Sequence, residues 1–422
     1  MDIFNKNIMI VGKGLSGVAA FEALQGIANP FFYQEDLKQQ NPDLIVISPG
    51  IGDHPILNFA KKNKITIRSE IELGYILDQR FASSKIVAVT GTNGKTSLTQ
   101  ILQKILSKSF FSIACGNIGV PFSQIAKIPH KISIVEVSSF QLERCKTFSP
   151  NIAIITNITP DHLDRHKTMK NYIAAKMRIA QSQTPSDFFI LPSILKKHIP
   201  KSTKSQIIFY DLECQKNDGY IYYKSKKAIK LTKKFGGQHN YQNLSIAAIV
   251  SGILGISKAK TNQALADFEF DAHRIQLIKK TKQRRWFDDS KATNIAACLA
   301  ACEAMDGETA LILGGSDKGY DYQQLFKGLP AKIKHIFITG QTAQKMLEAA
   351  AAVYQLNGKK TYQPNTDFPQ ITLASDLKSA VALSSKTSAK NILLSPAAAS
   401  FDCFKDYKDR GNHFKKFVEE LE

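Results

Sequence analysis

The stretch that decides the fold is residues 86–106, whose middle reads Thr90-Gly91-Thr92-Asn93-Gly94-Lys95-Thr96. The apolar run at residues 86–89 precedes it and predicts a short buried strand. After it, apolar side chains recur at helical spacing at Leu98, Ile101, Leu102, Ile105 and Leu106. A strand, a glycine loop and a helix in this order are the context that a phosphate-binding loop requires.

The residue types of this loop suit a nucleotide triphosphate. Gly91 and Gly94 allow the backbone N–H groups to approach phosphate closely. Lys95 would reach the β- and γ-phosphates, and the Thr96 hydroxyl would bind Mg²⁺. The generic pattern has a glycine where Val89 stands, so the loop is a variant, and the alternative is an ordinary turn before a helix.

Working outward, short apolar strands alternate with helical patterns along most of the chain, which predicts an α/β fold built from parallel sheets. We predict three domains. Residues 1–82 form a Rossmann-like domain, residues 83–271 a central P-loop ATPase-type parallel sheet, and residues 272–422 a second Rossmann-like domain. A small antiparallel insert is expected at residues 207–231. The expected strands are residues 7–11, 31–34, 44–48, 85–89, 132–137, 152–156, 286–288, 310–313, 335–339 and 391–395.

The unusual polar motifs follow these strands directly. They are residues 90–96, 136–139, 157–162, 289–294, 314–318 and 395–400. Open α/β sheets bind their ligands beyond the carboxyl ends of the strands. The sequence therefore predicts a site composed of loops from two sheets.

The formal net charge of the 422-residue chain is +20, with a pI near 9.5. Such a charge is compatible with nucleic acid, an acidic membrane surface or small anionic substrates. The lysines concentrate at residues 196–204, 224–234 and 279–285, and the first and third clusters lack the interleaved aromatic residues of a base-stacking surface. We interpret the clusters as solvated surface and expect no nucleic-acid partner.

Composition also bears on compartment. No run reaches the roughly 18 apolar residues that a membrane span needs, so we expect no membrane insertion. The six cysteines form no CxxC pair, and Cys298 and Cys302, one helical turn apart, fit a packed helix face better than a redox pair. This cysteine usage is typical of a reducing cytoplasm.

The phosphate-loop sequence resembles that of the Mur ligases and their folylpolyglutamate synthase relatives. The resemblance implies a three-domain enzyme that activates a carboxylate with ATP as an acyl phosphate and then adds an amino acid. It implies ATP as cosubstrate and two Mg²⁺ sites, with Mn²⁺ as an alternative metal. The ATP-binding residues implied in the loop are Thr90, Gly91, Thr92, Asn93, Gly94, Lys95 and Thr96.

The same resemblance assigns roles in the central domain. Glu136 and Thr96 would bind one Mg²⁺, and His162 the second. Lys176 matches a lysine that the family carbamylates, which gives it oxygens able to bind a cation. Asn117 would lie near the activated carboxylate, and Asn240 would contact adenine; from local sequence alone a turn asparagine and a helix cap are the alternatives.

In the last domain, Arg274 matches a family arginine that reaches ATP phosphate. Asp289 matches a family aspartate that holds the ribose of ATP. The motif Asp289-Ser290-Lys291-Ala292-Thr293-Asn294 resembles the D-glutamate-adding branch of the family. There Lys291 faces phosphate. The residues implied for binding D-glutamate are Thr293, Lys318, Ser400, Phe401 and Tyr407.

The N-terminal glycine motif is Gly12-Lys13-Gly14-Leu15-Ser16-Gly17, and Glu35 or Asp36 lies about where a ribose-binding acid would. Read alone, the motif suggests a dehydrogenase module that binds NAD. In the Mur family this fold holds the UDP end of the substrate instead. The positions that match are Leu15, Ser16, Ser48 and Gly50.

The resemblance therefore implies a monomeric ligase that adds D-glutamate to UDP-N-acetylmuramoyl-L-alanine during peptidoglycan precursor synthesis. Lys95, Asn117, His162, Lys176 and Lys291 are its expected catalytic residues. Two alternatives stay open: another Mur or folylpolyglutamate-type ligase, and a basic P-loop ATPase that binds nucleic acid. The amino acid that the enzyme accepts would distinguish the first alternative from the D-glutamate ligase. An affinity for DNA that falls steeply with salt would favour the second alternative.

Overall fold

The computed structural model describes residues 3–35, 41–51, 54–232, 235, 237–355 and 368–421, apart from the side chains of residues 164 and 239. The chain divides into two compact units, residues 1–235 with 240–268 and residues 236–239 with 269–422. Each unit has its own sheets and its own apolar cores. Among the described residues, no helix is long and apolar enough to cross a membrane.

The first unit begins with a four-stranded parallel sheet of order β2-β1-β3-β4. Its strands are β1 (Asn7–Val11), β2 (Asn29–Phe32), β3 (Leu44–Ile47) and β4 (Thr66–Ser69). Its helices are α1 (Leu15–Leu24), α2 (Pro55–Lys62) and α3 (Glu70–Phe81). The strands β1 and β3 are buried on both faces, as expected for parallel strands covered by helices.

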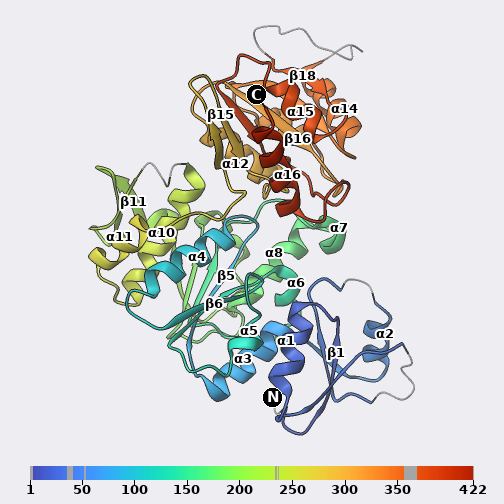
Figure 1. Ribbon diagram of the computed structural model, residues 1–422. Helices are drawn as coiled ribbons and strands as arrows, with labels where there is room; N and C mark the ends of the chain where they lie inside the picture. Colours follow the sequence, from blue (N-terminus) through green and yellow to red (C-terminus); the bar gives the residue numbers. More distant parts are fainter. Residues whose placement is uncertain are drawn as a thin grey trace. The chain divides into compact units, whose positions relative to one another are not determined.

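The second sheet of this unit has six parallel strands in the order β10-β9-β8-β5-β7-β6. Figure 1 labels its strands β5 and β6. Its strands are β5 (Lys85–Thr90), β6 (Ser112–Gly116), β7 (Ile132–Glu136), β8 (Ile152–Ile155), β9 (Phe188–Leu191) and β10 (Gln206–Phe209). Its helices are α4 (Lys95–Leu106), α5 (Phe122–Ile125), α6 (Ser139–Leu142), α7 (Leu163–His166), α8 (Met169–Met177), α9 (Tyr210–Glu213), α10 (Gln238–Ile253) and α11 (Lys258–Ala266). The strand β5 lies between β7 and β8, so three polar motifs follow three neighbouring strands.

The antiparallel insert is present but smaller than predicted. Strands β11 (Cys214–Asn217), β12 (Tyr220–Tyr223) and β13 (Lys226–Lys230) form it. Residues 206–209, which the prediction placed largely within the insert, instead pair in parallel with β9 as the edge of the central sheet. The prediction was wrong there because a short apolar run does not reveal which neighbour it pairs with.

The second unit contains a six-stranded sheet of order β14-β15-β19-β16-β17-β18. Its strands are β14 (Gln276–Lys280), β15 (Arg285–Asp288), β16 (Thr309–Gly314), β17 (Ile333–Thr339), β18 (Gln370–Leu373) and β19 (Asn391–Leu394). Its helices are α12 (Ile295–Ala304), α13 (Gln323–Gly328), α14 (Ala343–Tyr354), α15 (Leu377–Ser384) and α16 (Tyr407–Glu419). The sheet is mixed, because β14 runs antiparallel to β15 while the other pairs are parallel.

The α/β class with parallel sheets is therefore confirmed, whereas the division into three domains stays a prediction. Cys298 and Cys302 are both buried in α12, as the packed-face interpretation expected. Strands β4, β6, β9, β10, β14 and β18 were not among the expected strands.

Candidate active site

The phosphate loop connects β5 to α4, as predicted. Gly91 has a φ of +148° and Gly94 a φ of +81°, backbone conformations that side chains other than glycine rarely adopt. A Cβ atom on Gly91 would lie 1.9 Å from the Oγ1 of Thr156. These two positions therefore require glycine for reasons of space and backbone angle.

The segment after β8 holds the loop in shape. The amide of Thr92 donates to the carbonyl of Asn157 at 2.9 Å, and the amide of Asn93 donates to Asn157 Oδ1 at 3.0 Å. Thr156 donates from its hydroxyl to the carbonyl of Asn93 at 2.6 Å. These three bonds hold the backbone of the loop at Thr92 and Asn93 against the segment after β8, next to the start of α4.

Two lysines meet at the first glycine of the loop. The Nζ atoms of Lys95 and Lys176 each donate to the carbonyl of Gly91 at 2.9 Å. Lys176 is 2% exposed, and burial lowers the pKa of its ammonium well below the usual range; Lys95 lowers it further, against the opposing effect of nearby carboxylates. The lowered pKa leaves a larger share of the Lys176 amine neutral than for an exposed lysine.

Tyr172 contacts both Lys176 and the phosphate loop, and it was not among the site residues predicted from the sequence. It lies one helical turn before Lys176 on α8, and the lysine Nζ is 4.6 Å from the centre of its ring. Its hydroxyl is 3.2 Å from the Oγ1 of Thr92 in the loop. The four-residue spacing on one helix was the available signal.

Glu136 ends β7 and is 2% exposed. Its Oε1 accepts from the side-chain amide of Asn117 at 3.2 Å, so these two predicted residues are brought together. Its Oε2 has no hydrogen-bond partner among the described residues, and the same holds for the buried Oγ1 of Thr90. Oxygens of this kind beside a phosphate loop suit Mg²⁺, a hard cation that completes its shell with water and substrate phosphates.

His162 follows β8 in a left-handed conformation, with a φ of 53°. Its Nε2 lies 3.6 Å from Asp161, whose carboxylate is largely buried, and its ring packs edge-on against Phe140. Asp161 is also one of the carboxylates that raise the pKa of Lys176. This aspartate was not among the predicted site residues, although it adds negative charge where a cation is expected. Within the described residues, no three His, Cys, Asp or Glu side chains form a complete metal shell by themselves.

The helix α10 brings its first turns to the loop. A Cβ atom on Gly94 would lie 3.1 Å from the Oδ1 of Asn243, so this side chain packs against the loop glycine. Asn240, the predicted adenine contact, is 7% exposed in the same helix.

At the N-terminal sheet, Leu15 opens α1 and is 80% exposed, while Ser16 is half-buried beside it. A Cβ atom on Gly12 would lie 2.6 Å from the Oγ of Ser48, so β1 and β3 bring these predicted segments together. Gly50 is exposed two residues further on. Glu35 is exposed, and Asp36 lies outside the described residues.

Two arginines that the sequence did not single out lie beside Ser48. A small hollow of about 10 Å³, room for about one water molecule, is lined by Ser48, Arg144 and Arg165 among others. The guanidinium of Arg165 stacks 3.8 Å from the centre of the Phe140 ring and donates to the carbonyl of Pro49 at 3.2 Å. The hollow therefore joins the N-terminal sheet to the α6 and α7 segments with positive charge.

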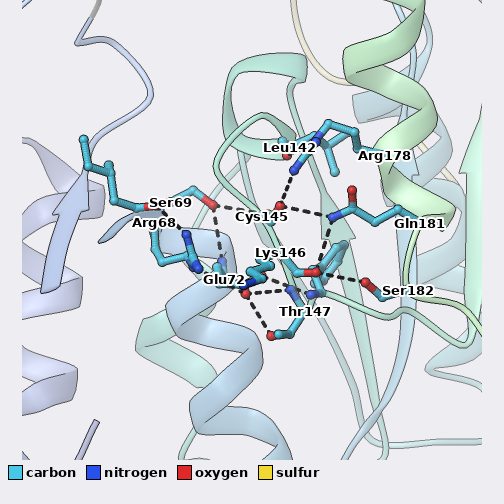
Figure 2. Close-up of polar contacts among 12 residues, drawn as sticks. Arg68, Ser69, Glu72, Leu142, Cys145, Lys146, Thr147, Arg178, Gln181 and Ser182 are labelled. Carbon is cyan, nitrogen blue, oxygen red and sulfur yellow. Dashed lines mark hydrogen bonds and ion pairs between the residues drawn. The ribbon is translucent and has the colours of Figure 1, made fainter. Parts of the chain in front are cut away.

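A buried carboxylate fastens α3 to the turn after α6. Figure 2 shows Glu72 reaching Thr147, whose amide and hydroxyl donate to its Oε1 at 2.7 and 2.8 Å. The amide of Phe148 donates to its Oε2 at 3.0 Å. On the other side of the turn, Arg178 donates to the carbonyls of Leu142 and Cys145. These bonds place α6, and hence the segment after Glu136, relative to the N-terminal sheet.

In the second unit, Asp289 follows β15 and accepts from the hydroxyl of Ser395 at 2.8 Å and the amide of Ile275 at 3.3 Å. Burial raises the pKa of Asp289 to about 7, and Ser395 and Arg274 act in the opposite direction. The predicted ribose and phosphate contacts of this unit, Asp289 and Arg274, are therefore electrostatically coupled.

Arg410 organises the remaining loops of this unit. It is 3% exposed in α16 and donates to the hydroxyl and carbonyl of Ser290, to Ala398 and to Ala399. An isolated bridge pairs Ser316 with Ala399. The loops after β15, β16 and β19 are thus gathered at one edge of the sheet, as the positions of their motifs predicted.

The predicted amino-acid contacts lie on these loops with different exposure. Lys291 has its Nζ 3.8 Å from Asp271 and 5.4 Å from the centre of the Tyr407 ring, so these two predicted residues are neighbours. Ser400 is buried and Phe401 is 73% exposed, whereas Thr293 and Lys318, in the loops after β15 and β16, are both half-buried.

Comparison with known proteins gives two family matches. Residues 89–251 match the Mur ligase middle domain, and residues 273–398 match the Mur ligase, glutamate ligase domain. UDP-N-acetylmuramoylalanine--D-glutamate ligase from Caldicellulosiruptor bescii is 34% identical over 100% of this chain and 99% of its own length. The protein of the same name from Bacteroides thetaiotaomicron is 35% identical over 90% of this chain and 86% of its own length.

Solved structures with the same fold have lower sequence identity. The ligase MurF from Thermotoga maritima, in complex with ADP, is 15% identical with a TM-score of 0.62 and covers 100% of this chain and 97% of its own. UDP-N-acetylmuramate-alanine ligase MurC from the same organism is 16% identical with a TM-score of 0.60 and covers 99% of this chain and 100% of its own.

Proposed function

The chain belongs to the Mur ligase family, and from that premise we propose that it joins D-glutamate to UDP-N-acetylmuramoyl-L-alanine while ATP is split to ADP and phosphate. It is an ATP-dependent ligase of peptidoglycan precursor synthesis. The observation that carries the choice of substrates is the length of the match, since relatives with this activity in their name align over the whole chain. We further propose that it acts as a monomer in the cytoplasm and that its three domains are residues 1–82, 83–271 and 272–422, of which the first and last are Rossmann-like.

The proposed reaction has two steps. The alanyl carboxylate attacks the γ-phosphorus of ATP, and the bond from this phosphorus to the β-phosphate oxygen breaks. ADP is the leaving group, and the substrate becomes an acyl phosphate. The amine of D-glutamate then attacks the acyl carbon through a tetrahedral intermediate. Phosphate leaves with the former carboxylate oxygen, the amine loses a proton, and an amide remains.

The residues of the phosphate loop support the first step. The backbone amides at the start of α4 and the ammonium of Lys95 would stabilise charge on the transferring group. Asn117, already bonded to Glu136, would orient the carboxylate that attacks. Bound Mg²⁺ supplies further charge neutralisation, and Thr96, Glu136, His162 and carbamylated Lys176 are the residues that would hold the two ions.

The carbamate on Lys176 forms when its neutral amine attacks carbon dioxide and releases one proton. Burial lowers the pKa of Lys176, so a larger fraction of this amine is neutral near pH 7 than for an exposed lysine. The product carries negative oxygens next to Lys95, which replaces the repulsion between two ammoniums with an attraction.

The remaining contacts are proposed from the family positions. Asn240 would contact the adenine of ATP, and Asp289 would bind its ribose. Arg274 and Lys291 would contact its phosphates. For D-glutamate the proposed contacts are Thr293, Lys318, Ser400, Phe401 and Tyr407. For the UDP moiety they are Leu15, Ser16, Ser48 and Gly50, beside the positive charge of Arg165.

Oxygen-18 transfer tests this mechanism. The alanyl carboxylate of the UDP substrate is labelled with oxygen-18, and the phosphate formed is analysed by mass spectrometry. We expect one labelled oxygen in each phosphate, because the carboxylate oxygen becomes the bridging atom of the acyl phosphate. Phosphate without label, formed together with the amide product, would exclude the acyl phosphate.

A further inference from the structure

One cavity lies in the first unit, apart from the phosphate loop. It has a volume of about 580 Å³ and is lined by β10, α10, α11 and the β12–β13 hairpin. None of the residues assigned to ATP, metal or substrate lines it. Its size falls within the range of small-molecule sites, about 300–1,000 Å³.

The wall of the cavity is apolar. Ile208, Ile229, Ile253 and Ile256 line it, and Ile229 and Ile256 are buried. Gly252 lets α10 approach the hairpin closely, because a Cβ atom there would lie 2.8 Å from the ring of Tyr223. The edge strand β10 contributes Ile207, which is 42% exposed. An apolar wall of this kind favours an apolar ligand body.

The mouth of the cavity is positively charged. Lys224, Lys226, Lys227 and Lys258 line it, against one acidic side chain, Glu213, so four positive charges and one negative leave a net +3. The side chains of three lysines are supported by rings: Lys227 and Lys258 lie 4.9 and 5.0 Å from the centre of Tyr220, and Lys224 lies 5.5 Å from that of Tyr223. Lysines gathered around a cleft raise the local concentration of anions.

One buried hydroxyl also faces this space. Ser251 in α10 lines the cavity, is 5% exposed, and its Oγ has no hydrogen-bond partner among the described residues. A buried polar atom normally has a partner, so a ligand atom is a natural one here.

We propose that this cavity binds an amphipathic anion, in which a carboxylate or similar acid group is attached to an apolar body of acyl-chain size. The isoleucine wall takes the apolar body, the lysines at the mouth take the acid group, and Ser251 offers one hydrogen bond inside. The site gives a use to part of the lysine cluster at residues 224–234, which the ligase reaction leaves unexplained. It is independent of the proposed function, since no residue is shared.

Isothermal titration calorimetry on the full chain, without ATP, tests the proposal with three probes. Decanoate has the tail and the negative charge, decyltrimethylammonium has the tail with a positive charge, and acetate has the charge without a tail. We expect decanoate to bind at least tenfold more tightly than either of the others. Equal affinity for decanoate and decyltrimethylammonium, or for decanoate and acetate, would overturn the proposal.

Variants locate the binding. The double variant Lys226→Glu/Lys227→Glu should bind decanoate at least tenfold more weakly than the wild type. The matched control is Lys196→Glu/Lys197→Glu, at exposed lysines outside the cavity, and its affinity for decanoate should change less than twofold. Ala228→Trp should fill the cavity and abolish binding in a protein whose thermal midpoint is retained. Lys95→Ala should bind decanoate normally, which separates this site from the phosphate loop. Equal losses in both lysine pairs, or unchanged affinity in Ala228→Trp, would contradict the assignment.

Discussion

The Nζ of Lys176 donates to the carbonyl oxygen of Gly91 at 2.9 Å, so a fully buried lysine of α8 contacts the first glycine of the phosphate loop. Lys95 donates to the same carbonyl. Burial is the main cause of the lowered pKa of Lys176, and the positive charge of Lys95 so close by lowers that pKa further. The proposed carbamate resolves this conflict.

Lys176 should therefore take up carbon dioxide. We expect a carbamate carbon resonance when the protein is equilibrated with ¹³C-bicarbonate, and its loss in Lys176→Ala together with roughly a 100-fold or greater loss of ligase activity. Lys170→Ala, an exposed lysine of the same helix, is the control and should keep both. A resonance that persists in Lys176→Ala would show that another amine is modified.

Glu72 should stabilise the first unit strongly. Glu72→Ala leaves the amides of Thr147 and Phe148 without their acceptor, which should lower the free energy of unfolding by about 3 kcal/mol. Arg68→Ala removes a 3.9 Å ion pair with Glu72 and a hydrogen bond to the adjacent carbonyl of Ile67, but it leaves the acceptor of both amides in place and should cost only about 1 kcal/mol. Urea unfolding followed by circular dichroism measures both, and equal effects would refute the assigned role of the carboxylate.

Glu70 should make stability depend on pH. Burial raises its pKa from 4.5 to about 7, and one oxygen accepts from the amide of Ser123 at 2.6 Å. The folded state therefore binds a proton that the unfolded state has lost, so the stability from neutral Glu70 is present below pH 4.5 and disappears as pH rises through about 7.

The variant Glu70→Gln imitates the neutral acid. The free energy of unfolding of this variant should equal that of the wild type near pH 4.5 and exceed it at pH 8 by up to about 3 kcal/mol. Thermal midpoints across this range provide the measurement, with Glu22→Gln, an exposed glutamate of α1, as control. Parallel pH profiles for wild type and Glu70→Gln would contradict the raised pKa.

Asp289 should give the KM for ATP a pH dependence. The pKa of Asp289 is raised to about 7, while the proposed ribose hydroxyls donate best to its charged form. The KM should therefore rise as pH falls below 7. Asp289→Asn should raise the KM by roughly tenfold and remove this dependence, whereas Asp306→Asn, an exposed aspartate near the end of α12, should behave as the wild type. A persisting pH dependence in Asp289→Asn would point to another group.

The parts of the site that local sequence revealed are those encoded by short motifs at strand ends. The glycine loop after β5 and Glu136 after β7 were predicted with their surroundings because strand, turn and helix signals are local. Arg410 was not, because it reaches Ser290 across 120 positions of the chain. Contacts of that length depend on how strands order themselves in a sheet, which periodicity does not encode.

The same limit explains the errors in the fold. Residues 206–209 form an apolar edge strand whose sequence is compatible with pairing either with the insert or with the central sheet. The structure shows that it pairs with β9 of the central sheet. Asp161 lay inside a quoted motif, but its burial and its effect on Lys176 come from packing.

Phosphate release from ATP, with UDP-N-acetylmuramoyl-L-alanine and one amino acid at a time, tests the central claim most directly. D-glutamate, L-glutamate, L-alanine and meso-diaminopimelate are offered separately, with bicarbonate and Mg²⁺ present. We predict release that requires the UDP substrate and D-glutamate together, and that falls at least roughly 100-fold in Lys95→Ala but not in Lys104→Ala of the same helix. Release with a different amino acid would contradict the proposed specificity, and no release with any pairing would contradict the ligase itself.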